Sequence, residues 1–375
     1  MTRKVLEVTR LEVVKILKAM LSTTLVIIFL LRVLGCDGDS GMEPQPRPEG
    51  WVFMGLADKE VRRVRLFGDY LYACAARDGL YRINVQQSGA EWEFLGLADS
   101  TLPRRIDGVL DVAVLNDNLV AAYSTPQAEE TGIFRAREGE FDWQPSDSGL
   151  GYGVSTLSPS PWASETIFAG ITGGAVYKSN NFGRNWKQVL VIAPTGPTIE
   201  VIRFHPIRAN EIWVVGQGFD YAELYRSTDS GETWQDLRRI LNVIFFHQYG
   251  DSSYFPQSLS EIAFDPANEN VIYLGSDWLW KSEDGGDTWS TTLDTVGVYR
   301  TVAINPFNSK EILVSSGSAL LISTNGAKTW QSIALPEPNS VISFIEVDWQ
   351  KRIVYTHIFS RELSRRVLGV YKMYF

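Results

Sequence analysis

The sequence predicts an all-β protein, a single seven-bladed β-propeller that an N-terminal strand closes, and three observations lead to this fold. A short turn motif ending in tryptophan recurs along the chain, and the six tryptophans of this repeat stand 41 to 55 residues apart. The two chain ends together hold the parts of one further repeat. A four-stranded propeller blade takes about 40–45 residues, and insertions lengthen individual copies. The 375 residues therefore fit one large repeat domain behind a leader segment.

The recurring motif is an apolar strand that ends in Lys or Arg, followed by Ser-x-Asp-x-Gly-x-x-Trp. It is complete around Asp229 and Asp284, while Asn181 and Asn325 replace the Asp in two weaker copies. A side-chain oxygen of Asp or Asn can accept backbone N–H bonds across a turn, Gly permits a positive φ, and Trp can fill the space between sheets. We expect this structural role, in the turn between the third and fourth strands, for Ser179, Asn181, Gly183, Trp186, Ser227, Asp229, Gly231, Trp234, Ser282, Asp284, Gly286, Trp289, Ser323, Asn325 and Trp330.

Strand-like runs surround each tryptophan of the repeat. A short run follows the tryptophan, and two β-rich runs precede the motif. In three repeats the first of these runs ends in a proline turn, at Pro206, Pro266 and Pro306. The tryptophans themselves are Trp92, Trp143, Trp186, Trp234, Trp289 and Trp330. Each repeat thus supplies the four strands of one blade.

The chain ends fix the number of blades. Trp51–Asp58 nearly duplicates Trp92–Asp99, so it predicts a fourth strand with no earlier three. Residues 344–347, 352–357 and 369–373 predict strands one to three with no fourth. The N-terminal strand therefore completes the last blade, and closing the ring removes the open sheet edges that invite aggregation. The propeller is expected to span residues 50–375.

Residues 1–35 predict a secretory signal of the lipoprotein type. Basic residues precede an apolar run of 13 residues, Ala19 to Leu31, whereas a membrane-spanning helix needs about 20. The segment Val33-Leu-Gly-Cys36 resembles a bacterial lipobox, so Cys36 is the expected lipidation site; an uncleaved anchor is the alternative. The Pro-rich residues 36–49 predict a flexible tether. Either version places the propeller outside the cytoplasm, held at a membrane and facing the periplasm or the cell exterior.

At its repeated turns the chain resembles the BNR/Asp-box propellers, over about residues 50–375. This class includes sialidases, sortilin-type receptors, two-propeller xyloglucan hydrolases, and photosystem II assembly factors with related bacterial lipoproteins. Size, blade count and the N-terminal segment are most similar to the last group, and that resemblance implies a protein-binding scaffold. The Tyr81-Arg-Ile-Asn84 segment lacks the proline of the sialidase motif. Because one scaffold hosts many functions, the motif indicates the fold more than the activity.

Composition excludes several functions. The net charge is −9, and it becomes −13 without residues 1–35, which is unfavourable for a nucleic-acid groove. The two cysteines, Cys36 and Cys74, predict no disulfide within the propeller, and we expect Cys74 to be a buried strand residue. No pair of Cys and His has zinc-ligand spacing. We therefore expect no metal and no cofactor.

The candidate binding face carries the loops between the second and third strands and those that lead to the next blade. A long aromatic run, residues 245–256, and the nearby residues 217–221 stand out there. Aromatic rings beside Asp and His can stack on a sugar or anchor a protein partner. The candidate binding residues are Phe219, Asp220, Tyr221, His247, Tyr249, Tyr254, Asp277, Trp278, Arg104, Arg105 and Arg300, with Tyr123 and Tyr152 reaching the same face. The alternative is a long loop that packs its own Phe245, Phe246 and Phe255 onto the rim.

Two functions follow from this face. The first is a non-catalytic extracytoplasmic lipoprotein that recognises a protein partner or assembly intermediate. The second is a carbohydrate-active enzyme that uses carboxylates at the channel mouth, with Asp220, Asp251 and Asp277 as the candidates for an acid/base pair. A separate set of arginines in the first and last blades is expected to form a solvated basic edge or a docking patch: Arg62, Arg63, Arg65, Arg361, Arg365 and Arg366.

Overall fold

The computed structural model describes residues 50–100, 108–124, 132–150, 153–192, 196–218, 222–239, 258–293, 297–360 and 367–375. The chain divides into two compact units, Met1–Arg47 and Pro48–Phe375, and every described residue belongs to the second unit. Within these residues 28 strands form seven antiparallel four-stranded sheets. No helix in the described ranges is long and apolar enough to cross a membrane. The protein is an all-β, seven-bladed propeller, as the sequence predicts.

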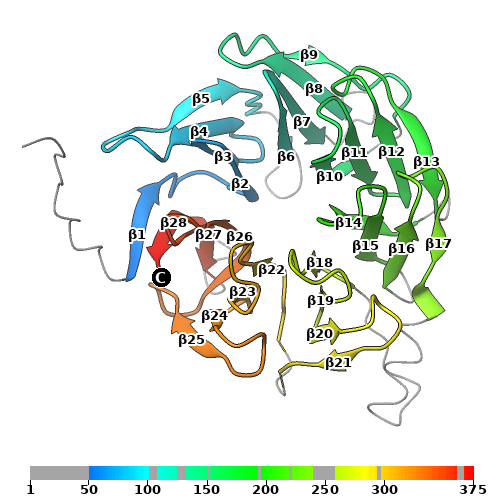
Figure 1. Ribbon diagram of the computed structural model, residues 1–375. Helices are drawn as coiled ribbons and strands as arrows, with labels where there is room; N and C mark the ends of the chain where they lie inside the picture. Colours follow the sequence, from blue (N-terminus) through cyan, green and yellow to red (C-terminus); the bar gives the residue numbers. More distant parts are fainter. Residues whose placement is uncertain are drawn as a thin grey trace, which may run out of the picture. The chain divides into compact units, whose positions relative to one another are not determined.

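Each sheet is one blade, and in six of the seven blades the strands follow one another outward from the ring centre in chain order (Figure 1). The inner strands are β2 (Arg63–Phe67), β6 (Gly108–Leu115), β10 (Val154–Pro159), β14 (Thr198–Phe204), β18 (Glu261–Phe264), β22 (Thr301–Ile304) and β26 (Ser340–Asp348). The second strands are β3 (Tyr70–Cys74), β7 (Asn118–Ser124), β11 (Ile167–Ile171), β15 (Ile212–Gln217), β19 (Ile272–Gly275), β23 (Ile312–Ser315) and β27 (Ile353–Ser360).

The outer half of each blade completes the sheet. The third strands are β4 (Leu80–Asn84), β8 (Gly132–Arg137), β12 (Ala175–Ser179), β16 (Glu223–Ser227), β20 (Leu279–Ser282), β24 (Ala319–Ser323) and β28 (Val367–Tyr374). The outermost strands are β5 (Glu93–Gly96), β9 (Gln144–Pro145), β13 (Lys187–Val191), β17 (Gln235–Asp236), β21 (Ser290–Thr291), β25 (Gln331–Ala334) and β1 (Gly50–Gly55). Blades 1 to 6 start at β2, β6, β10, β14, β18 and β22, and blade 7 combines β26, β27 and β28 with β1.

The core lies between neighbouring blades. Neighbouring blades cover both faces of each second strand, so these strands consist of continuous apolar runs. In β11, for example, all five residues are buried. Each of the seven apolar clusters joins residues of two adjacent blades. Trp213 and Trp280, in the cluster between blades 4 and 5, are among the largest fully buried side chains of the propeller. Cys74 is completely buried in another of these clusters, as predicted. Burial rather than turn chemistry therefore determines how the blades pack.

The N-terminal strand closes the ring as predicted. β1 pairs antiparallel with β28, from Gly50 opposite Tyr374 to Gly55 opposite Val370. The Trp51 indole N–H donates to the Ala334 carbonyl of blade 6 at 2.9 Å. At the other junction, between blades 7 and 1, the inner strands β26 and β2 contact each other. Blade 7 is thus held to both neighbours by the two ends of one chain.

Three of the six repeat tryptophans donate a hydrogen bond to the preceding blade. Trp92 donates its indole N–H to the Met54 carbonyl of the preceding outer strand at 2.7 Å, and Trp143 makes the same bond to Leu95 at 2.6 Å. Trp186 donates to Ser146 at 2.9 Å. These bonds are present in blades 1 to 3, whose turn motif is incomplete or carries Asn. In blades 4 and 5, where the motif is complete, the Trp234 indole N–H has no hydrogen-bond partner in the described residues, and Trp289 donates to Gly286 of its own turn at 2.9 Å.

The turn motif is a hydrogen-bonded unit. Asp229 Oδ1 accepts the backbone N–H groups of Glu232 and Thr233 at 3.0 and 2.8 Å and the Ser227 hydroxyl at 2.8 Å. The Ser227 oxygen in turn accepts the N–H of Gly231, whose φ is +85°. These contacts hold the pKa of Asp229 down at about 2 because the Thr233 hydroxyl and the backbone donors favour the charged carboxylate. Such an ionised, fully engaged carboxylate is suited to holding a turn and not to transferring protons.

Candidate functional site

A network of charged side chains lies among the inner strands that surround the central channel. Asp111 on β6 is fully buried and accepts from Arg63 at 2.7 Å and from Nε and Nη2 of Arg65 at 2.8 Å each. Its Oδ2 also accepts the backbone N–H of Leu157 at 2.9 Å. Arg65 reaches Glu346 of β26 at 3.5 Å. One carboxylate therefore connects the inner strands of blades 1, 2 and 3, and Arg65 extends the connection to blade 7.

A second ion pair continues this network on the other side of the ring. Arg203 of β14 contacts Glu261 of β18 at 2.9 Å. Burial raises the pKa of Glu261 and of Glu346, and the arginines oppose that effect. Burial also opposes ionisation of Asp111, but Arg63 and Arg65 outweigh it and hold its pKa far below the usual range. The three carboxylates are matched by three arginines, so the network is balanced in charge and braces the strands.

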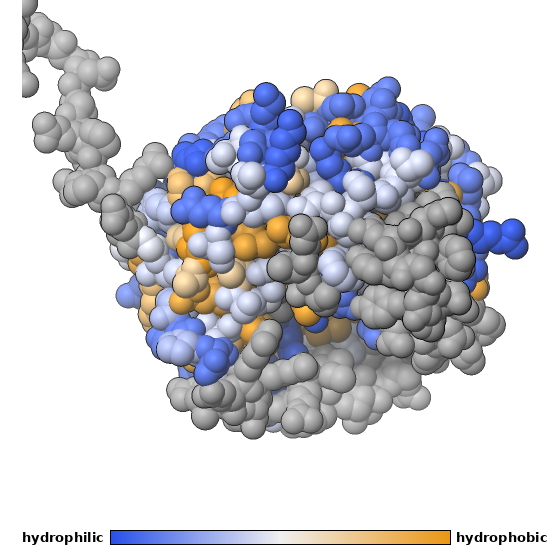
Figure 2. All heavy atoms as spheres, turned by 90° about the horizontal axis from the view of Figure 1, so that it is seen from below, coloured by the Kyte–Doolittle hydropathy of each residue, from blue (hydrophilic) through white to orange (hydrophobic). Residues whose placement is uncertain are grey.

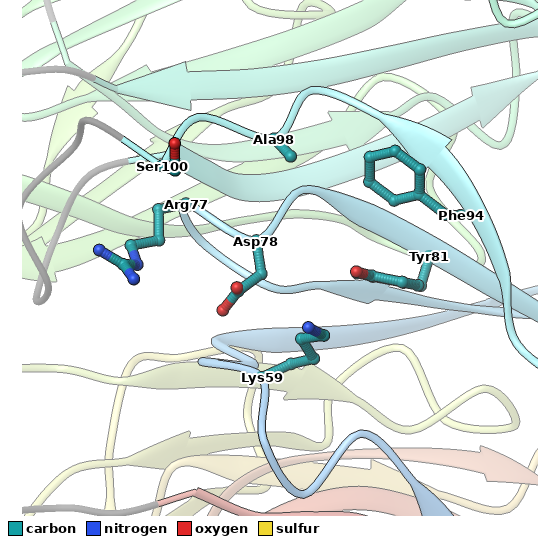
Figure 3. Close-up of a pocket in the computed structure, with 7 residues that line it drawn as sticks. All are labelled: Lys59, Arg77, Asp78, Tyr81, Phe94, Ala98 and Ser100. Atoms are coloured by element: carbon teal, nitrogen blue, oxygen red, sulfur yellow. The ribbon is translucent and has the colours of Figure 1, made fainter.

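A surface cavity of about 230 Å³ lies where blade 7 meets blade 1 (Figure 3). The Tyr81 hydroxyl, the Asp78 carboxylate and the Lys59 side chain turn toward the same space. The lining residues come from the segment after β1, the β3–β4 turn, β4, β5 and the segment after β5: Lys59, Arg77, Asp78, Tyr81, Phe94, Ala98 and Ser100. Lys59 is 3.2 Å from Asp58, and Asp78 accepts the N–H of Glu60 at 3.1 Å. The cavity combines an aromatic wall with charges of both signs.

The aromatic wall of this cavity has a counterpart one blade away. Phe94 and Tyr81 lie 5.2 Å apart between ring centroids, and Phe53 and Tyr371 lie 5.3 Å apart in blade 7. Both phenylalanines are half exposed, at 51%. Figure 2 views the edge of the ring, and apolar side chains interrupt its polar surface on the side where Figure 1 places β1 and β25. We did not predict this pair from sequence, although the duplicated Trp-x-Phe segments carry the signal.

The structure describes three of the predicted binding residues. Asp277 is exposed in the turn between β19 and β20, and its carbonyl accepts the N–H of Gly297 at 3.0 Å. Trp278 is half-buried and packs against the core shared by blades 4 and 5. Arg300 is exposed just before β22, so its side chain lies at the surface. The remaining candidates lie outside the described residues: Arg104, Arg105, Tyr152, Phe219, Asp220, Tyr221, His247, Tyr249, Asp251, Tyr254 and the lipidation residue Cys36.

Two sequence expectations are wrong. Arg63 and Arg65 belong to the channel network and do not form a solvated basic edge, because they lie on the inner strand of blade 1 and are paired with Asp111. Tyr123 is buried at 8% exposure and packs edge-on against Phe134, so it does not reach the binding face. No group of three or more His, Cys, Asp or Glu residues in the described ranges could hold a metal ion.

Comparison with known sequences gives limited similarity. No protein-family model matches the chain. A xyloglucanase of Acetivibrio thermocellus, Xgh74A, is 27% identical over a stretch that covers 36% of this chain and 20% of the enzyme. The chain therefore spans far less than the length of this relative, and the similarity does not establish a family.

Solved structures share the fold. A GH74 xyloglucanase from Xanthomonas campestris superposes with a TM-score of 0.61 at 15% identity, over 85% of this chain and 55% of that chain. YCF48 bound to a D1 peptide gives 0.60 at 14% identity, over 87% and 96%. The extracellular domain of the BT4673 system of B. thetaiotaomicron gives 0.60 at 13% identity, over 88% and 40%. At these identities the chain is similar to enzymes and to a peptide-binding protein in its fold alone.

Proposed function

We propose that the chain is a non-catalytic extracytoplasmic lipoprotein, a member of the BNR/Asp-box propellers, that binds a protein partner through its propeller. The state of the channel carboxylates carries this proposal. A glycosidase needs two carboxyl groups with separate tasks, one of which gives up or takes a proton. In the described residues Asp111, Glu261 and Glu346 are each paired with an arginine. Such carboxylates brace strands.

The accessible cavity supports the same proposal. Its lining contains one carboxylate, that of Asp78, and this group already accepts a backbone hydrogen bond. Half-exposed aromatic rings next to charges of both signs are typical of surfaces that bind polypeptides. The solved structure of YCF48 with a D1 peptide is an example of a propeller of this fold that binds a peptide.

A carbohydrate-active enzyme is the second candidate, and the sequence similarity to the Xgh74A xyloglucanase favours it. The two proposals differ in a direct assay. The full-length chain in detergent micelles is incubated with xyloglucan and a panel of other glycans, and new reducing ends are measured. We expect no hydrolysis above the buffer control. Hydrolysis that disappears in Asp220→Asn or Asp277→Asn would overturn the scaffold proposal.

Binding is tested in parallel by chemical cross-linking. The full-length chain is cross-linked in its solubilised native membrane, and mass spectrometry identifies the cross-linked peptides. We expect one protein to be cross-linked at defined positions on the propeller. Cross-links spread over many proteins with no preferred position on the ring would contradict a specific scaffold.

The lipid anchor is tested separately. Metabolic labelling with a radioactive fatty acid is expected to mark the wild-type chain, and the Cys36→Ala variant is expected to lose the label. A variant that stays labelled would contradict Cys36 as the lipidation site, and an unlabelled wild type that fractionates with membranes would favour the uncleaved anchor.

A further inference from the structure

The hairpins between the first and second strands carry large apolar side chains at one recurring position. In blades 3 to 6 this hairpin contains a proline, and the residue after the proline is, in blade order, Trp162, Ile207, Ala267 and Phe307. The three large side chains among them are exposed, Trp162 at 48%, Ile207 at 43% and Phe307 at 69%. Seven large apolar side chains are exposed in the described ranges, so three of the seven share one position of the repeat.

The hairpin turn does not need a large apolar residue at this position. In each of the four blades a side chain two residues earlier accepts the backbone N–H of the residue in question, at 2.8 to 3.2 Å. The acceptors, from blade 3 to blade 6, are Ser160, His205, Asp265 and Asn305. Blade 5 forms the same turn around Ala267, so the acceptor side chain and the proline are sufficient for it. The large side chains of the other three blades are therefore available for a contact outside the turn.

The four turns lie at the same end of the ring, which we name the hairpin end. The Trp162 indole N–H donates to the His205 carbonyl of the next blade at 3.4 Å, and Arg208 of that blade reaches Glu269 of the following one at 3.1 Å. Since a propeller repeats one arrangement around its axis, equal positions of the repeat lie at equal heights. The three exposed apolar side chains therefore lie at one level, along an arc from blade 3 to blade 6.

The N-terminal strand begins at the hairpin end. The register of blade 7 places Gly50 opposite Tyr374, Tyr374 opposite Ile353, and Ile353 opposite Asp348. Asp348 ends the first strand of this blade and Ile353 begins the second, so both belong to the hairpin. Gly50 is therefore level with the hairpins, and the segment before β1 joins the ring at the end that carries the apolar side chains.

The tether predicted from the sequence keeps this end of the ring close to a membrane. Residues 36–49 separate the lipid expected on Cys36 from Gly50. A flexible chain of this length has an average end-to-end distance of about 20 Å, and its fully extended length is about 50 Å. The anchor therefore holds the hairpin end at a high local concentration near the bilayer, where even weak contacts are populated.

The chemistry of the hairpins suits a lipid surface better than an ionic partner. Indole and phenyl rings are favoured in the layer between lipid headgroups and hydrocarbon. The charged side chains that are not buried on these four hairpins are two of each sign, Glu165, Glu269, Arg208 and Lys310. Protein-binding hot spots cluster at one place, whereas these apolar side chains belong to three blades and lie at one level. A planar, fluid surface can contact all three at once.

We propose that Trp162, Ile207 and Phe307 lie in the interfacial layer of the membrane that anchors the chain, so that the hairpin end of the ring faces the lipid. This inference rests on the proposed lipoprotein function and adds the orientation of the propeller at the membrane. The apolar side chains stabilise the contact by leaving water. The opposite end of the ring, with the loops between second and third strands, then faces away from the membrane and is open to a protein partner.

Quenching of a fluorescent label by lipid tests this orientation. The full-length chain is reconstituted into phosphatidylcholine vesicles that contain doxyl-labelled lipid, with an environment-sensitive dye on an introduced cysteine. Ala267→Cys places the dye at the shared turn position, where we expect quenching and a blue-shifted emission. Val298→Cys is the matched control, an exposed position (37%) just before β22 at the other end of the ring, and is expected to show neither. The unaltered chain, labelled in the same way, gives the background from Cys36 and Cys74.

A triple variant tests the three side chains themselves. Trp162→Ala, Ile207→Ala and Phe307→Ala give blades 3, 4 and 6 the residue that blade 5 carries. With the dye at position 267, the ratio of docked to undocked chains, calculated from the quenching, is expected to fall about tenfold or more, with no loss in melting temperature. A folded triple variant that is quenched like the wild type would overturn the proposal. If the triple variant is unstable, the comparison of positions 267 and 298 still decides the orientation.

Flotation of the vesicles separates this inference from the proposed function. A chain that floats with the vesicles but is quenched equally at positions 267 and 298, or at neither, would leave the membrane anchor standing and overturn the orientation. A chain that does not float would overturn both. Cross-links from a partner protein that concentrate beside Trp162, Ile207 and Phe307 would assign the hairpin end to a protein and would likewise overturn the lipid contact.

Discussion

Asp111 is the residue on which the channel contacts converge. It accepts from two arginines and from a backbone N–H while completely buried. Taking a carboxylate and two guanidinium groups out of water is costly, and their mutual attraction offsets this cost only while all of them are present. The network therefore makes blades 1 and 2 depend on one side chain.

We expect Asp111→Asn to lower the free energy of unfolding by about 3–5 kcal/mol, because it leaves Arg63 and Arg65 without their shared counter-charge. Urea denaturation followed by tryptophan fluorescence measures the change. Asp117→Asn, an exposed carboxylate in the hairpin of the same blade, is the control and is expected to be nearly neutral. A loss for Asp111→Asn no larger than the control would contradict the bracing role.

His357 gives stability a dependence on pH. Burial, with Arg62 and Arg63 nearby, lowers its pKa from 6.5 to about 4, and its Nδ1 has no hydrogen-bond partner in the described structure. The unfolded chain therefore takes up a proton near pH 6.5, while the folded chain does so only near pH 4. The contribution of His357 to the free energy of unfolding is therefore fully present above pH 6.5. It falls by roughly 3 kcal/mol as the pH drops from 6.5 to about 4. We expect His357→Phe to flatten the fall between pH 6.5 and 4.5 in urea titrations, and an unchanged slope would contradict the assignment.

At the scale of elements, the turn motif tolerates Asn in place of Asp. Asn325 Oδ1 accepts the N–H groups of Lys328 and Thr329 at 3.2 and 2.9 Å, which reproduces the bonds of Asp229 in blade 4. The geometry needs an acceptor oxygen at this point, and the charge is secondary.

Asp229→Asn is therefore expected to lower the melting temperature less than Asp229→Ala, since only the alanine leaves the backbone donors of Glu232 and Thr233 without an acceptor from the motif. Thermal unfolding followed by circular dichroism compares the two variants with the wild type. Equal losses in both would mean that the charge of Asp229, and not the acceptor oxygen, stabilises the turn.

The sequence predicted the elements better than the contacts between them. Strand pairing across the chain ends could be predicted because the Trp51 and Trp92 segments are near duplicates, and only the Trp92 segment follows three strands of its own. The pairing of Arg65 with Asp111 joins residues 46 positions apart on the inner strands of adjacent blades, and no local pattern reveals which side chains meet there. The half-exposed Phe53 and Phe94 were missed because a repeat is recognised by what its copies share, whereas these two residues are where two copies depart from the rest.

At the scale of the whole molecule, deletion of residues 50–58 is expected to open the ring. It removes β1 and leaves the outer edge of β28 unpaired, which exposes backbone donors and acceptors to other chains. We expect a lower melting temperature and concentration-dependent light scattering on heating. Trp51→Phe keeps the strand and loses one hydrogen bond, so it serves as the milder control. A deletion variant as stable as the wild type would contradict closure by β1.

The pairing of β1 with β28 also determines when the ring can close during synthesis. β1 is made first and its partner last, with more than 300 residues between Trp51 and Met373 in the register. Such a distant pairing forms slowly, because the chain loses loop entropy before the contact rewards it. During synthesis β1 therefore has no partner until the rest of the ring has been made. The ring is complete only when the final strand has been made, so an interrupted chain lacks blade 7 and the contact between Phe53 and Tyr371.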